Sequence, residues 1–484
     1  MQQILKTVNS FVWGIPALIL ILGIGLYLTI KTGFAQFRLL PRSFGAFFGK
    51  GDREGNENGI SSFQALCTAL AATVGTGNIA GVAGAIALGG PGSIFWMWIC
   101  ALLGMITKFA EATLAVRFRK KDHNGNLIGG PMYIIEAGMG RSWHWLAVIY
   151  CMFGVIAALG VGNATQINAV VTGFNEAAAF FGGTTSETGN VAIAAVFAAL
   201  TAVILLGGAK RIGGIAELLV PIASAAYLAL GLGALVYHIQ SIPQALCSIV
   251  TGAFQPKAVT GGILGSAFHA LRIGAARGVF TNEAGMGTAA IAHGSSGVRH
   301  PAQQGLMGIM EVFLDTIVIC TMTALVILTS GVTIPYGTDE GALLTTKAFA
   351  CTYGQWISIP IALFLCCFAF ATMIGWGLYG LRCAQYLFGQ HHDRFFVIIL
   401  SAAAIVSALL KTGTVWLLAE TVNGLMALPN LIALAVLSPV TVELTHSFIQ
   451  AEHQKPASGK NPPKARKSRP AHCRGHGSRG SFHR

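Results

Sequence analysis

Long apolar runs recur along almost the whole chain, and they limit its fold more than any other feature of the sequence. A helix needs about 20 mostly apolar residues to cross the hydrocarbon core of a membrane. Of the 484 residues, 54% are hydrophobic and only 10% are charged, so we predict an all-α polytopic membrane protein without a separate soluble domain. The runs predict eleven transmembrane helices, at residues 11–30, 62–88, 93–116, 144–172, 190–207, 213–238, 261–292, 305–330, 356–382, 394–410 and 414–447.

The distribution of Lys and Arg predicts how these helices are oriented. Positive residues gather in the short loops on the cytoplasmic side of a membrane. They follow the first, third, fifth, seventh and ninth predicted helices, whereas the loops at 89–92, 173–189 and 331–355 carry few of them. We therefore expect the N-terminus outside and the C-terminus in the cytoplasm.

The predicted helices divide into two halves. With helix 11–30 set aside as an extra N-terminal helix, residues 62–238 and 261–447 each contain five helices. The first helix of one half crosses the membrane in the opposite direction to the first helix of the other, so the repeat is inverted. Inverted repeats are typical of secondary transporters, and we assign residues 1–450 to one transmembrane transporter domain.

The end of the chain differs in composition from the predicted membrane domain. Residues 451–484 hold nine Lys and Arg residues against one acidic residue, Glu452, and are rich in Pro, Gly and Ser. Such a segment cannot bury a core, so we predict a disordered basic cytoplasmic tail. A solvated tail that touches anionic lipid explains this charge better than nucleic-acid binding does.

Two of the predicted helices are interrupted by glycine and polar residues. Residues 71–81 read AATVGTGNIAG in the first helix of one half, and residues 276–290 read ARGVFTNEAGMGTAA in the first helix of the other. Interrupted segments in matching positions of two halves indicate a binding site near the membrane midplane. The freed amides of a half-helix suit a carboxylate, and freed carbonyls suit sodium, so a small zwitterion and a cation would satisfy both.

The first stretch also fits two other patterns. Gly77 and Gly81 form the Gly-x-x-x-Gly spacing of close helix packing, although the matched second interruption favours a binding site. Gly75, Gly77 and Ala80 fit a dinucleotide-binding fingerprint, which requires a preceding strand and an acidic residue about 20 positions further on. Since residues 95–100 read FWMWIC, we reject the dinucleotide site.

Five long segments resemble one family of transporters. They read TALAATVGTGNIAGVAGAIALGGPGSIFWMWICALLGMITKFAE (68–111), GGPMYIIEAGMG (129–140), ARGVFTNEAGMGTAAIAHG (276–294), FLDTIVICTMTALVIL (313–328) and CFAFATMIGWGLYG (367–380). The pattern resembles the alanine or glycine:cation symporter family of bacteria and archaea over roughly residues 11–447. The resemblance implies a five-plus-five inverted repeat of the leucine-transporter type with one extra N-terminal helix. It also implies sodium-driven uptake of alanine or glycine across the bacterial cytoplasmic (inner) membrane.

The resemblance implies roles for residues at both interruptions. The substrate carboxylate is expected to meet the amides of Thr76 and Gly77, and Asn78 is expected to add a side-chain contact. From the sequence itself, Gln166 and Asn163 are candidates to line the pocket, and hydrogen bonds between helices explain them equally well. The second interruption is expected to supply further substrate contacts from Phe280, Asn282, Gly285 and Met286.

Sodium is expected to be the co-transported ion. By analogy with related sodium symporters, the carbonyls of Ala71 and Val74 and the hydroxyl of Thr372 are its predicted ligands. Thr372 and Trp376 are i, i+4 on one helical face, so Trp376 is predicted to close the pocket that Thr372 helps to line.

Ionisable residues inside the predicted helices are also candidates for function. A charge at the membrane centre costs about 2.5–3.5 kcal/mol on insertion scales. Glu283 lies beside the second interruption and could receive the substrate amine, pair with Arg277 or Arg272, or carry a proton as a coupling carboxylate. Lys108 and Glu111 are i, i+3, which predicts a structural ion pair.

Secondary symport is the function that these observations favour. A channel needs filter loops or rings of like charge, and the sequence has no hydrolase, metalloprotease or complete Walker motif, so we predict that the protein is not an enzyme. A proton-coupled symporter, or a member that prefers glutamine or serine, is the alternative. The expected partners are a small amino acid and the lipid bilayer, without nucleic acid, and we expect a monomer.

Overall fold

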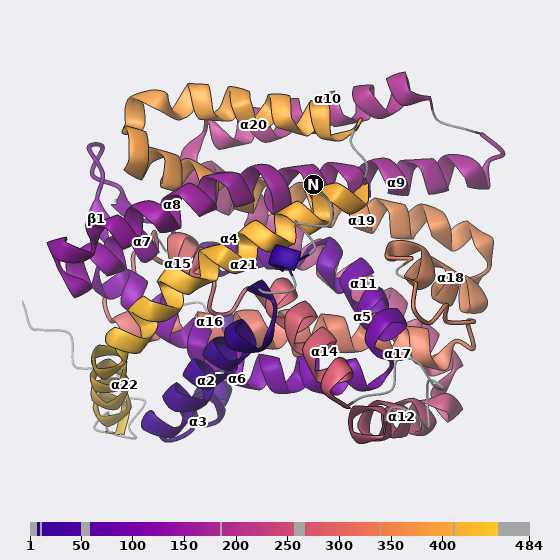
Figure 1. Cartoon of the computed structure of the whole chain (residues 1–484), viewed down its shortest axis with the longest axis horizontal. Helices are drawn as coiled ribbons and strands as arrows, with labels where there is room; N and C mark the ends of the chain where they lie inside the picture. The colour runs from indigo at the N-terminus through magenta and orange to yellow at the C-terminus, as the bar shows by residue number, and fades with distance from the viewer. Residues whose placement is uncertain are drawn as a thin grey trace, which may run out of the picture.

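The computed structural model describes residues 7–9, 12–49, 59–183, 186–255, 267–338, 340–409 and 412–453, and most of these residues are helical (Figure 1). A short antiparallel hairpin of β1 (Lys120–Lys121) and β2 (Leu127–Ile128) extends from one end of the molecule. The residues at 454–484 lie outside the described part of the chain, so the prediction of a disordered tail is untested, apart from 451–453, which belong to the last helix.

The helices follow the predicted order along the chain. In the first part they are α2 (Ile15–Lys31), α3 (Ala35–Phe48), α4 (Ser62–Thr73), η1 (Thr76–Asn78), α5 (Ala80–Gly89), α6 (Gly92–Arg117), α7 (Pro131–Ile134), η2 (Ile135–Met139), η3 (Arg141–Trp143), α8 (His144–Leu159), η4 (Gly160–Ala164), α9 (Thr165–Phe180), α10 (Glu187–Leu205), α11 (Gly208–Tyr237), η5 (Ile239–Ser241) and α12 (Ile242–Phe254). In the second part they are α14 (Ala267–Asn282), α15 (Thr288–His293), α16 (Pro301–Val312), η6 (Phe313–Cys320), α17 (Thr321–Thr329), α18 (Ala342–Tyr353), η7 (Gln355–Ile357), α19 (Ser358–Phe388), η8 (Gln390–His392), α20 (Asp393–Ser407), α21 (Thr412–Val436) and α22 (Ser438–His453).

The number of candidate membrane spans is lower than the sequence predicts. Among the described residues, 6 helices are long and apolar enough to cross a membrane, or up to 9 if each bent pair counts as one span. The predicted spans 261–292 and 394–410 correspond to α14 with α15 and to α20, which are not among those nine. Six to nine spans still describe a multi-pass membrane protein, whereas the count of eleven is not confirmed.

Among the described residues, three helices of 12 or more residues lie where the sequence predicts loops. They are α3, α12 and α18, with 14, 13 and 12 residues, so none is long enough to span a bilayer alone. The chain turns by 83° between α2 and α3. Helix α3 carries Arg38 and Arg42 and exposes Phe34 beside its start and Phe48 at its end, as is typical of a helix at a membrane surface.

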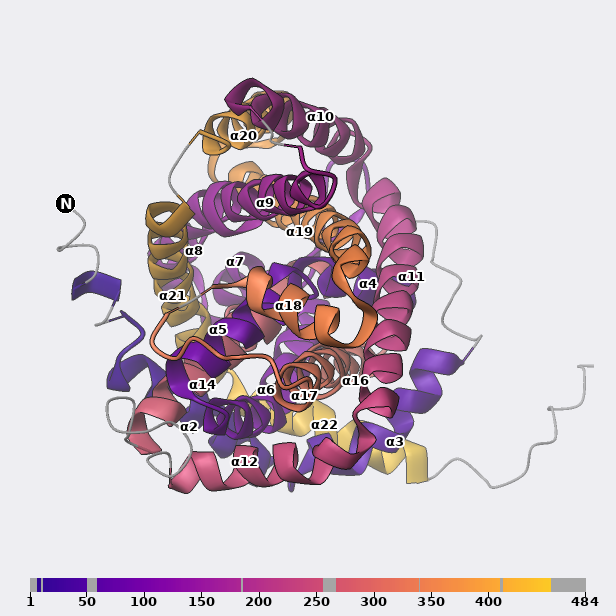
Figure 2. The same ribbon diagram turned by 90° about the vertical axis from the view of Figure 1, so that its right-hand side faces the viewer.

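The helices pack in two groups, and the broken helices belong to the first. We call α4, α5, α6, α14, α15, α16, η6 and α17 the bundle, because these helices contact one another. We call α8, η4, α9, α10, α19 and α20 the scaffold, for the same reason. In Figure 2, the labelled scaffold helices lie in a layer above α4, α5, α6, α14, α16 and α17 of the bundle. The two broken helices therefore face the scaffold across one interface.

Helix α4 begins with a well-formed cap that fixes the entry of the chain into the bundle. The Ser61 hydroxyl accepts the Gln64 amide at 3.0 Å, and the Gln64 side chain accepts the Ser61 amide at 3.2 Å. This reciprocal pair satisfies two amides that have no helical partner. The first break lies one helix length further on.

Candidate functional site

The first break lies where the sequence predicts it, between α4 and α5. Helix α4 ends at Thr73, Gly75 is extended with φ −136° and ψ −154°, and the two arms are bent by 59°. The Gly75 amide donates to the Asn78 side chain at 2.9 Å instead of continuing the helical ladder. The Asn78 side chain therefore stabilises the unwound backbone of its own segment.

The amides at the start of the second arm are the donors predicted to hold a carboxylate. Asn78 and Ile79 donate backwards to Gly75 and Thr76, each at 3.3 Å, but the amides of Thr76 and Gly77 donate to no other described residue. Thr76 is 1% exposed, and Gly77 is also buried. Buried amides without a partner are rare in proteins, so this pair points to a missing acceptor.

The predicted sodium ligands meet at the same break. A Cβ atom on Gly75 would lie 2.6 Å from the Thr372 hydroxyl, and one on Gly375 would lie 2.9 Å from the Ala72 amide, so α19 touches the end of α4. The Thr372 hydroxyl is buried and has no hydrogen-bond partner in the described chain. Ala71 and Val74 are each 1% exposed. An orphaned hydroxyl beside interrupted carbonyls fits the donor set that a hard cation requires.

The second break lies between α14 and α15, within the interrupted stretch 276–290 that the sequence predicts. Glu283 has φ 53°, Gly285 has φ 92° and Gly287 has φ 77°, so the helix unwinds over 283–287. Positive φ is strained for a glutamate, and residues held in this region gather at functional sites. Phe280 and Asn282 belong to the last turn of α14 rather than to the unwound stretch.

Protein groups occupy the unwound backbone of this second break. The Glu111 carboxylate, from α6, accepts the amides of Gly285 and Gly287 at 3.0 Å each and the Asn430 side chain at 2.7 Å. Asn430 also donates to the Gly285 carbonyl at 2.9 Å. The backbone groups predicted to face substrate at Gly285 are thus bonded to α6 and α21.

Glu283 is held by two neutral donors. Its carboxylate accepts the Trp376 indole N–H at 2.8 Å and the Thr288 hydroxyl at 2.6 Å, and the residue is 2% exposed. Arg277, one of its suggested partners, pairs with Glu420 at 3.1 Å. The bond from Trp376 connects the scaffold helix α19 to the second break.

One turn of η6 joins the two breaks. The Asn78 side chain donates to the Asp315 carboxylate at 2.6 Å, and the Asn282 side chain donates to the Thr316 hydroxyl at 3.3 Å. Thr316 in turn donates to Asp315 at 2.7 Å. The Asn78 side chain is thus used inside the protein, between Asp315 and the Gly75 amide.

The remaining predicted residues divide into those near the breaks and those elsewhere. Gln166 accepts the Thr76 hydroxyl at 3.3 Å, so it reaches the first break from α9. Asn163 donates to the Leu400 carbonyl at 2.6 Å and serves contact between scaffold helices. Met286 is fully buried in the hydrophobic core. Phe280 lines a separate pocket of about 100 Å³ together with Trp13.

The predicted ion pair between Lys108 and Glu111 is wrong. Lys108 instead pairs with Glu311 at 2.8 Å, with both side chains fully buried, while Glu111 caps the second break. The reason is that α16 packs along α6 and brings Glu311 close to Lys108. The sequence pattern assigned Glu111 a different partner, and it predicted none for Asp315 or Asn430, which bond to residues of the two breaks.

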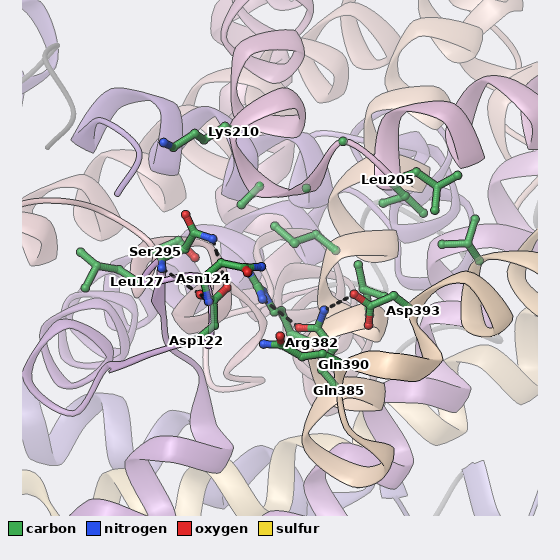
Figure 3. Close-up of a pocket in the computed structure, with 18 of the residues that line it drawn as sticks. Asp122, Asn124, Leu127, Leu205, Lys210, Ser295, Arg382, Gln385, Gln390 and Asp393 are labelled. Atoms are coloured by element: carbon green, nitrogen blue, oxygen red, sulfur yellow. Dashed lines mark hydrogen bonds between the residues drawn. The ribbon is translucent and has the colours of Figure 1, made fainter. Parts of the chain in front are cut away.

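Two pockets approach the breaks from opposite ends of the same helices, and we name them the outer and the inner pocket after the orientation that the sequence predicts. The outer pocket, of about 500 Å³, is lined by Thr76 and Gly81 after the first break, by Arg277 before the second, and by Leu365 early in α19. The inner pocket, of about 570 Å³, is lined by residues before α4, by Ser295 after α15 and by the late part of α19 (Figure 3). The breaks and the buried Trp376 therefore lie between two vestibules.

The chain matches known transporters over nearly its full length. The model of the sodium:alanine symporter family matches residues 1–462. The sodium/alanine symporter AgcS of Methanococcus maripaludis is 43% identical over 453 residues, which cover 92% of this chain and 97% of that protein. The probable sodium/glutamine symporter GlnT of Bacillus subtilis is 36% identical over 473 residues, covering 96% of this chain and 94% of that one.

The fold also resembles that of a solved transporter. The crystal structure of MhsT in complex with L-phenylalanine matches with a TM-score of 0.56 at 15% identity, covering 81% of this chain and 99% of that one. At this identity the match speaks for the fold alone. It agrees with the predicted leucine-transporter type of architecture.

Proposed function

Because the chain belongs to the sodium:alanine symporter family, we propose that it couples the inward movement of sodium to the uptake of a small neutral amino acid, with alanine as the first candidate. The observation that carries this proposal is the first break, where the paired amides of Thr76 and Gly77 and the Thr372 hydroxyl all lack a partner in the described chain. The two unpartnered amides and the unpartnered hydroxyl lie close together in the buried region between the outer and inner pockets.

The amino acid is proposed to bind through its carboxylate at the start of the second arm of the first broken helix. The amides of Thr76 and Gly77 point their N–H groups at an anion, and the positive end of the helix dipole adds to the attraction. Asn78 contributes by holding this segment unwound, Gln166 orients the Thr76 hydroxyl, and Trp376 closes the site. Asn282, Gly285 and Met286 are proposed to support the other side of the site from the second break without contacting the substrate, and Phe280 lies in the separate pocket beside Trp13.

Sodium is proposed to bind beside the substrate, between the end of α4 and α19. The carbonyls of Ala71 and Val74 and the hydroxyl of Thr372 would be its ligands, all of them oxygen donors as a hard cation prefers. Since Thr372 belongs to the scaffold and Ala71 to the bundle, the ion would join the two groups. Binding of sodium would therefore favour the arrangement in which the substrate site is complete.

Transport is proposed to occur by rocking of the bundle against the scaffold. The contacts Thr76 to Gln166, Gly75 to Thr372, and Glu283 to Trp376 all cross this interface, so relative motion there opens or closes the site. We further propose eleven transmembrane helices, an inverted repeat of residues 62–238 and 261–447, an external N-terminus and a monomer that acts in the cytoplasmic membrane.

The test is uptake of labelled L-alanine by proteoliposomes under an inward sodium gradient, an inward proton gradient or neither. We expect uptake with sodium alone, and uptake that ignores sodium would overturn the proposal. Thr372→Val, which removes one cation ligand without changing volume, should raise the half-saturating sodium concentration by about tenfold or more. Thr201→Val is the matched control, because Thr201 is a buried threonine on α10 whose hydroxyl likewise lacks a partner.

Proton coupling is a second candidate, and Glu283 is the observation that favours it. A buried carboxylate bonded to Trp376 and Thr288, without a basic partner among the described residues, is placed to gain and lose a proton as its surroundings change. Glu283→Gln should abolish uptake driven by a proton gradient. Absence of proton-driven uptake by the wild type, or proton-driven uptake that this variant retains, would rule the candidate out.

Substrate preference within the family needs its own measurement, because the relatives include a probable glutamine symporter. Unlabelled alanine, glycine, serine and glutamine should be compared as competitors of labelled alanine. We expect alanine and glycine to compete best.

A further inference from the structure

The inner pocket holds two buried polar atoms of opposite character that lack a partner. Arg382, in the last part of α19, is 8% exposed, and its Nε atom makes no hydrogen bond within the described chain. The Asp393 Oδ1 atom, at the start of α20, is buried and also without a partner there. Both residues line the same cavity of about 570 Å³.

One glutamine fixes the distance between these two charges. Arg382 donates to the Gln385 side chain at 2.8 Å, and Gln385 donates to the Asp393 Oδ2 atom at 2.9 Å. Figure 3 shows this chain of hydrogen bonds within the pocket. The guanidinium and the carboxylate are thus held apart by a bridging amide, with Nε and Oδ1 left over for another molecule.

The other walls of the pocket limit what that molecule can be. The Asp122 carboxylate is fully used, because it accepts the amides of Asn124 and Asn126 and the Asn126 side chain at 2.8–3.2 Å. Leu205, Leu378 and Leu381 add apolar surface. Lys210, His391 and Arg394 also line the pocket and make it more basic, so its ligand must carry an anionic group. The unpartnered Asp393 Oδ1 atom favours an anion that also carries a cationic group, and the leucines leave room for a small apolar one.

We propose that the inner pocket is a second amino-acid site, in which Arg382 binds the carboxylate and Asp393 the ammonium group of the transported zwitterion. This inference rests on the proposed function and extends it. Trp376 and Arg382 are six residues apart on α19, about 9 Å along the helix, so a molecule that passes Trp376 meets this site next. The site receives the amino acid as it leaves the midplane.

The test compares the two faces of the membrane. In right-side-out and inverted vesicles, alanine exchange gives a half-saturating concentration for each face separately. Arg382→Gln and Asp393→Asn should each raise this concentration about tenfold or more on the face of the inner pocket, as expected for the loss of a charge-assisted hydrogen bond. Both should leave the opposite face within about twofold.

Arg141→Gln is the control, because Arg141 is an exposed arginine before α8 that lies outside the pocket, and it should change neither face. An equal effect of Arg382→Gln on both faces, or none on either, would overturn the inference. If that variant fails to fold, the isosteric Asp393→Asn carries the same comparison.

Binding without sodium separates this inference from the proposed function. The pocket contains none of the proposed sodium ligands, so equilibrium dialysis of labelled L-alanine against the purified full-length protein in sodium-free buffer should detect one site that Arg382→Gln removes. Absent sodium-driven uptake by the wild type would defeat the proposed function while leaving this readout intact. Absent sodium-free binding would defeat the second site alone.

Discussion

The two breaks differ in what their free amides bind. At the break between α4 and α5, the amides of Thr76 and Gly77 have no partner in the described chain. At the break between α14 and α15, the amides of Gly285 and Gly287 donate to the Glu111 carboxylate. Both breaks place unwound backbone inside a membrane protein, where unsatisfied polar groups are costly. The protein supplies a carboxylate of its own at the second break, and we propose that the substrate supplies one at the first.

This difference suggests that the two breaks have different roles. The first break, which we propose binds the ligand, has two amides without a protein acceptor in the described chain. The second break is bonded to α6 and α21, and it contacts α19 through Glu283 and Trp376. A matching interruption in each predicted half therefore does not imply equal contact with substrate.

Removing the carboxylate at the second break should have the largest effect. Glu111→Ala leaves the amides of Gly285 and Gly287 and the Asn430 side chain without their acceptor, and each buried unsatisfied donor costs about 1–3 kcal/mol. We expect loss of nearly all alanine uptake together with a lower thermal unfolding temperature. Glu136→Ala, which breaks the partly exposed pair with Lys120, is the control, and normal stability of Glu111→Ala would erase the contrast between the breaks.

Blocking the first break should abolish binding with less effect on stability. A Cβ atom on Gly77 would meet the nearest atom of Thr281 at 3.5 Å, which is ordinary contact, so Gly77→Ala should fold. Gly77→Val crowds the approach of a carboxylate to the amides, and we expect an affinity loss of about 100-fold or more. Binding of labelled alanine and unfolding of both variants should be measured in parallel. Wild-type affinity of Gly77→Val would contradict the site.

A methyl group two residues earlier should act on the ion rather than on the amino acid. A Cβ atom on Gly75 would lie 2.6 Å from the Thr372 hydroxyl, so Gly75→Ala must displace one proposed sodium ligand. We expect the half-saturating sodium concentration to rise about tenfold, with alanine affinity recovered at saturating sodium. A defect that high sodium does not relieve would argue against this division between ion and substrate.

Weakening α16, which leads directly into the η6 turn that holds Asn78 and Asn282, should produce the smallest effect, shared by the two breaks. His300 caps α16 by accepting the Ala302 amide at 3.2 Å, and burial lowers the pKa of its imidazole. The neutral form is therefore favoured in the folded protein, and its contribution is present above the ordinary pKa of about 6.5 and is lost as pH falls below it. When the pH is lowered from 7.5 to 5.5, we expect the free energy of unfolding to fall by at most about 1 kcal/mol.

This pH dependence can be isolated with one variant. His300→Ala should be slightly less stable at pH 7.5 and should lack the extra loss at pH 5.5. An unchanged pH profile in that variant would place the titrating group elsewhere.

The sequence predicted the features that depend on local pattern. Apolar runs located most of the helices, and the glycine and polar residues at Gly75–Asn78 located the first break, because both signals lie within one segment. The short helices α3, α12 and α18 were missed since they are too short to span a membrane, and Lys108 was given the wrong partner because spacing along one helix is blind to α16 packed beside it.

The features that the sequence did not predict depend on residues far apart in the chain. Glu111 and Asn430 are separated by 319 positions, and Asn78 and Asp315 by 237. A charged residue inside an apolar run signals only that a partner must exist. Which partner it has is decided by how the helices pack, and a single sequence contains no record of that.

Asn78 and Asn282 are tied to Asp315 and Thr316, which are neighbours in one turn of η6. Neither interrupted segment can shift far without straining the hydrogen bond that the other makes to η6. This linkage disfavours movement of one broken helix without the other. A transporter with such a linkage would limit the flow of sodium that is not coupled to amino-acid transport, and so preserve the sodium gradient.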